Sequence, residues 1–104
     1  MGLAQKKGRS SKSAISRKKA EDLHRHVREW ALGEKTLERE FAFDGFAEAV
    51  DFVYDVASIA EAEDHHPEIH IAYNTVRLTL STHAVGGLTE KDFLLAAQIN
   101  QLIS

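Results

Sequence analysis

Apolar side chains recur at helical spacing between residues 46 and 63, and this stripe predicts a long helix with one core-facing side. Its apolar positions are Phe46, Ala49, Val50, Val53, Ala57 and Ala60. Asp44 is the predicted N-cap, and Pro67 is expected to end the helix near His66, because the residue before a proline disfavours the α region.

Alternation with a period of two predicts four strands in the rest of the chain. Residues 30–32 are a short predicted strand that enters a turn. Residues 37–43 are the second strand, with Leu37, Phe41 and Phe43 on its buried face. Arg39 shares that side, so it should lie near an edge or have a partner. Residues 69–74 and 76–83 also alternate, and residues 74–75 predict the tight turn of an antiparallel hairpin.

Two more helices complete the predicted order. Ser16 is a plausible N-cap for a helix that runs to about Arg28. Thr89, followed by Asp92 three residues later, resembles a capping box that opens a last helix to about Ile103. The order helix, two strands, helix, two strands, helix predicts a two-layer α+β domain.

The length of 104 residues fits one domain, and its composition excludes several kinds of protein. The absence of cysteine removes disulfides, thiolate zinc sites and cysteine nucleophiles. Apolar runs are too short for a membrane span, and the N-terminus lacks the apolar stretch of a secretory signal. Its basic, serine-containing composition overlaps with that of transit peptides. We expect a cytoplasmic protein, with the nucleus as an alternative, and no membrane partner.

The net charge of -3 is unevenly distributed. Residues 1–20 carry seven basic groups and no acid, whereas residues 21–104 carry six basic and sixteen acidic side chains. Such an acidic domain should repel nucleic acid, so we expect no direct nucleic-acid contact. Residues 1–14 have no apolar period and are predicted to form a disordered basic tail, with the folded domain at residues 15–104.

Acidic residues and two adjacent histidines are concentrated in residues 61–68, where the helix ends against Pro67. Histidine titrates near neutral pH, so this cluster suits proton transfer. His83, at the end of the second hairpin strand, could converge on His65 and His66 if that strand packs beside the helix end. Each histidine alone is also explained as an ordinary surface or hydrogen-bonded residue, and the pair fits a helix terminus equally well.

A metal site is the rival chemical interpretation of these residues. The candidate ligands are His65, His66, His70 and His83, with Asp64 or Glu61. Adjacent histidines usually diverge, however, and no HExxH pattern is present, so we predict no metal. Phosphate-binding glycine motifs are absent too, and residues 86–87 are better explained as a turn.

Four motifs together resemble the pterin-4a-carbinolamine dehydratases, over about residues 15–103. They are Asp64-His65-His66-Pro67-Glu68, Tyr73-Asn74-x-Val76, the strand end Thr82-His83, and Gly87-Leu88-Thr89 followed by Asp92. The resemblance implies a four-stranded antiparallel sheet with three helices on one face. It also implies homodimers formed through sheet edges, and often homotetramers formed through helices.

The resemblance further implies an enzyme without a cofactor, a hydro-lyase that converts 4a-hydroxytetrahydrobiopterin to quinonoid dihydropterin and water in tetrahydrobiopterin recycling. The implied catalytic residues are His65, His66 and His83, of which His66 would mainly hold the substrate. The implied substrate-binding positions are Glu61, Asp64, Pro67, Thr82, Lys91 and Asp92. Relatives commonly have tryptophan at position 69 and arginine at position 91, where this chain has Ile69 and Lys91. These differences bear on substrate affinity.

Two other functions stay open at this point. Animal members of the family also serve as dimerisation cofactors of a homeodomain transcription factor, which by resemblance alone makes a transcription-factor partner conceivable. A catalytically silent relative retained for assembly is the other alternative, and the presence of His65, His66 and His83 argues against it.

Overall fold

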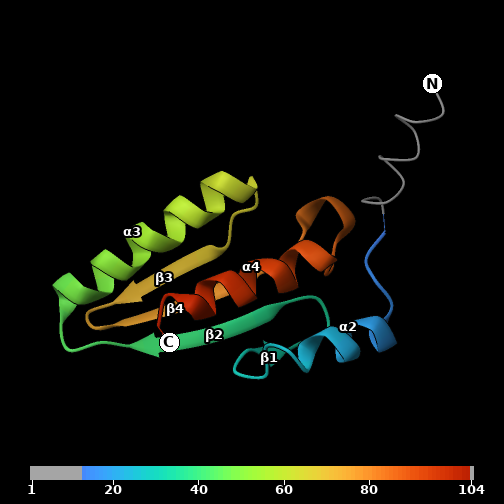
Figure 1. Ribbon diagram of the computed structural model, residues 1–104, viewed down its shortest axis with the longest axis horizontal. Coiled ribbons are helices and arrows are strands. Elements are labelled where there is room, and N and C mark those ends of the chain that lie inside the picture. Colours follow the sequence, from blue (N-terminus) through green and yellow to red (C-terminus); the bar gives the residue numbers. More distant parts are fainter. Residues whose placement is uncertain (1–12, 104) are drawn as a thin grey trace.

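The computed structural model describes residues 13–103, which form three α-helices and a four-stranded antiparallel sheet (Figure 1). Residues 1–12, from the predicted basic tail, and Ser104 lie outside the described part. The predicted α+β class and order are confirmed. The elements are α2 (Arg17–His24), β1 (Ala31–Leu32), β2 (Leu37–Ala42), α3 (Phe46–Glu63), β3 (Glu68–Ala72), β4 (Thr75–Leu80), the 3-10 turn η1 (His83–Val85) and α4 (Glu90–Gln101).

The strands lie in the order β1-β2-β4-β3, so β2 and β4 are the interior strands. Their ladder runs from Leu37 opposite Leu80 to Ala42 opposite Thr75. Alternate residues of the two strands are buried on one face, against apolar side chains of all three helices. The helices therefore share one side of the sheet. Strand β3 forms an edge, and all its residues are exposed.

Arg39 lies on the buried face of an interior strand, and it has partners there as predicted. Its Nη1 donates to Asn100 Oδ1 at 2.6 Å, and its guanidinium lies 4.6 Å from the centre of the Phe41 ring. The fully buried Trp30 donates its indole N–H to the same oxygen of Asn100 at 2.8 Å. This asparagine thus joins α4 to both β2 and the residue before β1.

Asn100→Ala is expected to lower the free energy of unfolding by about 1–3 kcal/mol, because the buried indole N–H of Trp30 would lose its acceptor. Urea denaturation followed by circular dichroism measures the change. Asn100→Asp keeps an acceptor for both donors and serves as the control, with a smaller loss. Equal stability of wild type and the alanine variant would show that these bonds contribute nothing.

Helix α2 is shorter than predicted, since it ends at His24 and not near Arg28. The chain then forms tight turns, and His24 Nε2 donates to the carbonyl oxygen of Trp30 at 2.6 Å. These turns bury Val27 and Trp30 in the core. The spacing of Leu23 and Val27 fits a helix, but only Leu23 lies in α2, where it is half-buried, and Val27 is buried by the turns that follow.

Two other predicted positions shift by one residue. Gly45 occupies the N-cap of α3, so the prediction of Asp44 was wrong. The hairpin turn consists of residues 73–74 and not 74–75, because Thr75 pairs with both Ala72 and Ala42. Asn74 also fixes the turn by donating its side-chain amide to the carbonyl of Phe43 at 2.9 Å.

Helix α3 ends before Pro67, as predicted. Its last helical residue is Glu63, and Asp64 follows in the left-handed conformation with φ at 52°. The backbone N–H of Asp64 contacts the carbonyls of Ala60 and Glu61, which closes the helix. None of the helices within residues 13–103 has the length and apolarity needed to cross a membrane.

Candidate active site

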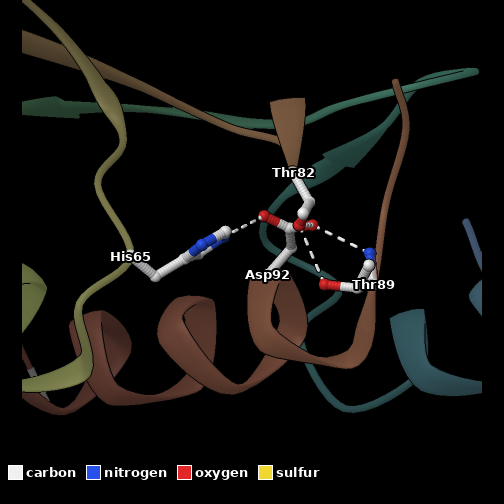
Figure 2. Close-up of polar contacts among 4 residues, drawn as sticks. All are labelled: His65, Thr82, Thr89 and Asp92. Carbon is white, nitrogen blue, oxygen red and sulfur yellow. Dashed lines mark hydrogen bonds and ion pairs between the residues drawn. The ribbon is translucent and has the colours of Figure 1, made fainter. Parts of the chain in front are cut away.

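Four polar residues from separate parts of the chain converge where α4 begins (Figure 2). His65 enters from the segment that leaves α3, and Thr82 from the segment that follows β4. Thr89 is the N-cap of α4, and Asp92 lies in its first turn. The antiparallel order of β3 and β4 returns the chain to the same end of the sheet, which is why these segments meet.

Asp92 is the centre of the cluster and has no solvent exposure. Its Oδ1 accepts a hydrogen bond from His65 Nε2 at 2.6 Å. Its Oδ2 accepts from Thr82 Oγ1 at 2.8 Å and from the backbone N–H of Thr89 at 2.9 Å. The predicted capping box of Thr89 and Asp92 is confirmed. A buried carboxylate is costly without donors, and these three donors satisfy it.

The contact with Asp92 assigns the tautomer of His65. An ionised carboxylate only accepts hydrogen bonds, so Nε2 must carry the hydrogen. Nδ1 is then the ring nitrogen left to exchange a proton with a ligand. The side chain is only 11% exposed, and its backbone N–H bonds the carbonyl of Ala60 at 3.1 Å, so both the ring and its backbone are held.

The hydroxyl of Thr82 makes two hydrogen bonds, one with Asp92 and one with Thr89. Because it has one hydrogen and gives it to Asp92, Thr89 Oγ1 must be the donor in their mutual contact at 2.8 Å. The predicted substrate-binding position Thr82 thus supports Asp92. Whether it also contacts a substrate stays a prediction.

His65 and Thr82 border a pocket of about 620 Å³, a volume typical of small-molecule sites. Lys91, another predicted position, also lines this pocket, from the first turn of α4. The cluster around Asp92 therefore presents one histidine to a cavity that can hold a ligand.

Sequence reasoning missed several residues of this pocket. Ser13, Ile15, Ala84 and Glu90 line it as well, and Ser13 falls within the predicted tail. A signal for Ile15 was present, because an apolar residue just before an N-cap often packs against the helix it precedes. Ser13 is polar and offered no such signal.

His66 has a different partner from its neighbour. Its Nε2 donates to Glu61 Oε2 at 2.6 Å, and both side chains are exposed. Adjacent histidines diverge here, as expected, since His65 bonds a buried carboxylate and His66 a surface one. Pro67 is half-buried directly after them, and the exposed Asp64 directly before them closes α3.

His83 lies at the start of η1 and is exposed. It lines a separate cavity of about 200 Å³, together with Lys35 and Gly86. Within residues 13–103, no hydrogen bond joins it to His65 or His66. The convergence of all three histidines and their assigned roles therefore stay predictions.

The described residues also include no group of three or more His, Asp or Glu side chains placed to hold a metal ion.

The fold and this site define the class of protein. The family model for pterin 4 alpha carbinolamine dehydratase matches residues 13–102, and the chain belongs to this family of hydro-lyases. The match includes every residue of the cluster around Asp92. The resemblance noted from the sequence motifs is thereby confirmed.

Individual relatives agree with this assignment. The chain is 50% identical over 74 residues to a Picosynechococcus sp. protein that carries the family's name, across 71% of this chain and 80% of the relative. It is 43% identical over 94 residues to Arabidopsis thaliana pterin-4-alpha-carbinolamine dehydratase 2, mitochondrial, across 86% of this chain and 50% of the relative. A crystal structure of a transcriptional coactivator/pterin dehydratase from Brucella melitensis superposes with a TM-score of 0.81 and 33% identity. That alignment covers 88% of this chain and 100% of the other.

Proposed function

We propose that this protein removes water from 4a-hydroxytetrahydrobiopterin, yielding quinonoid dihydropterin, as a step of tetrahydrobiopterin recycling. The observation that carries the proposal is the bond of 2.6 Å between His65 and the buried Asp92 at the edge of a ligand-sized pocket. Membership of the dehydratase family supports the same reaction.

The reaction needs two proton transfers and no electron transfer. The bond between carbon 4a and its hydroxyl oxygen breaks, and the oxygen leaves as water after it gains a proton. Nitrogen 5 loses its proton, and a double bond forms between carbon 4a and nitrogen 5. One general base and one general acid are therefore sufficient, and the proposal requires no cofactor.

His65 is suited to be the base. Its Nδ1 accepts the proton from nitrogen 5, while Nε2 keeps its hydrogen bond to Asp92. The imidazolium formed in this step lies beside a buried carboxylate, which stabilises its positive charge. Thr82 and Thr89 also donate to Asp92, so its carboxylate is held in place beside His65.

His83 is the proposed acid for the leaving oxygen. It directly follows Thr82, which lines the pocket, and its side chain is exposed. Glu61 orients His66, which we assign to substrate binding. Asp64, Pro67, Thr82 and Lys91 complete the proposed binding positions.

His66→Ala is expected to raise KM by about tenfold and to leave kcat within about twofold, because a contact made equally in the bound and transition states affects binding alone. Steady-state dehydration kinetics measure both constants. Glu61→Gln keeps His66 but weakens the hydrogen bond that orients its ring. This variant should also raise KM, by a smaller factor. A normal KM in His66→Ala would contradict the assigned role.

Stopped-flow dehydration of synthetic 4a-hydroxytetrahydrobiopterin tests the proposed function. Wild type and His83→Ala are compared with the spontaneous reaction, after treatment of both proteins with a chelator. We expect fast turnover by wild type that resists the chelator and falls strongly in the variant. A wild-type rate no higher than the spontaneous rate would reject the dehydratase proposal.

An interaction function is the second candidate, and exposed apolar residues favour it. Along α3, Phe46 is 55% and Tyr54 is 73% exposed, and β3 leaves an unpaired edge. Such surfaces suit a homodimer or homotetramer. They also suit a different protein partner, and the Brucella melitensis relative is described as a transcriptional coactivator as well as a dehydratase. We propose a homo-oligomer in the cytoplasm, with the nucleus as the alternative.

A further inference from the structure

We propose that residues 13–15, here called the N-terminal wall, form a fixed side of the catalytic pocket and set how tightly the pterin binds. This inference rests on the proposed function for the identity of the ligand. Ser13 and Ile15 line the pocket that His65 borders. The wall comes from the opposite end of the chain to α4, and Figure 1 shows it running past the start of that helix.

Hydrogen bonds hold the wall and the helix that follows it. The backbone N–H of Ile15 donates to the carbonyl of Leu88 at 2.9 Å, and its half-buried side chain packs against the core. Ser16 then accepts a bond from the backbone N–H of Lys19 at 3.1 Å, which fixes the start of α2. The segment is therefore attached at Ile15 and at Ser16, and these two bonds define its position relative to the pocket.

A close approach at Gly87 permits this position. A Cβ atom added to Gly87 would lie 2.9 Å from the Cβ of Ala14, well inside normal contact between carbon atoms. The φ angle of Gly87 is not in the left-handed region, so the need for glycine is one of space. The carbonyl of Gly87 also accepts from the backbone N–H of Thr82 at 2.7 Å. The wall therefore rests on the loop that carries Thr82.

The chemistry of the wall limits what it can do. Ile15 offers an apolar surface and Ser13 a hydroxyl, and neither side chain serves as an acid or base near neutral pH. Contacts of this kind stabilise the bound substrate and the transition state equally. They change KM and leave kcat unaffected. Displacing the wall should accordingly weaken binding without slowing the chemical step.

Gly87→Ala tests the inference, because the added methyl group must push against Ala14. We expect KM to rise by about five- to tenfold with kcat within about twofold of wild type. Ala14→Gly in the Gly87→Ala background removes the opposing methyl group and should restore KM. Ala14→Gly alone is the matched control, with KM near that of wild type, because among the wall residues only Ser13 and Ile15 line the pocket.

A binding measurement separates this inference from the proposed function. Calorimetric titration with 7,8-dihydrobiopterin, a stable dihydropterin, should show the same weakening in Gly87→Ala and the same rescue.

Unchanged affinity in Gly87→Ala, or a failure of Ala14→Gly to restore it, would overturn the role of the wall while leaving the dehydratase proposal intact. A wild-type protein that neither binds the dihydropterin nor accelerates dehydration would overturn both. Weakening and rescue of binding in a protein without dehydratase activity would reject only the proposed reaction.

Discussion

Replacement of His65 by alanine is expected to lower kcat for dehydration by about 10²- to 10⁴-fold, the range that general acid–base catalysis contributes. The structure gives the reason, since Nδ1 of His65 is the ring nitrogen available to a ligand in the pocket. Stopped-flow turnover measures the loss, and circular dichroism establishes that the variant is folded.

His65→Gln separates catalysis from support of Asp92. Glutamine keeps an N–H donor for the carboxylate but has no group that accepts a proton near neutral pH. The two variants should therefore be equally slow, while the glutamine variant should be the more stable in urea. Wild-type kcat in both variants would remove His65 from the chemical step.

Asp92→Asn is expected to have the second large effect, a fall in kcat of about 10²- to 10⁴-fold. The amide group of asparagine can donate a hydrogen bond to His65 Nε2, which favours the tautomer with the hydrogen on Nδ1. That tautomer cannot accept the proton of nitrogen 5 at Nδ1. The buried network also loses its charged acceptor, so the free energy of unfolding should fall by about 1–3 kcal/mol.

Substitutions at Thr82 provide the control for Asp92. Thr82→Ser keeps the hydroxyl that donates to Asp92 Oδ2, and Thr82→Val removes it at nearly constant volume. We expect near-normal kcat in the serine variant and an intermediate loss in the valine variant. Wild-type kcat in Asp92→Asn, measured by the same stopped-flow assay, would show that the carboxylate does not act through His65.

Local patterns were sufficient to predict much of the fold. The apolar spacing from Phe46 to Ala60 and the alternation around Leu78 depend on periods of a few residues, and they predicted α3 and β4 correctly. The core-facing side of α3 was predicted only in part, because Phe46, Val50 and Ala57 are exposed and the buried residues are Ala49, Phe52, Val56 and Ala60. The capping box at Thr89 and Asp92 is local for the same reason. The boundaries of α2 and of the hairpin turn were less predictable, because burial of Trp30 and the pairing of Thr75 decide them.

The site was only partly predictable, because its contacts cross long stretches of sequence. The adjacent histidines before Pro67 marked the helix end, but local spacing does not join His65 to Asp92, which is 27 residues away. The same holds for the N-terminal wall, whose contact with Leu88 depends on how α2 packs beside α4. Sequence motifs thus indicated the candidate residues, and the packing of distant segments determined which of them lie together.

Asp92 caps the last helix and also sets the tautomer of the proposed base. Active-site residues in many enzymes weaken the fold that carries them, so selection for heat resistance tends to remove them. This carboxylate behaves in the opposite way, since its loss should harm folding and turnover together. A laboratory evolution experiment that selects for thermostability alone should therefore retain Asp92, even without any selection for dehydratase activity.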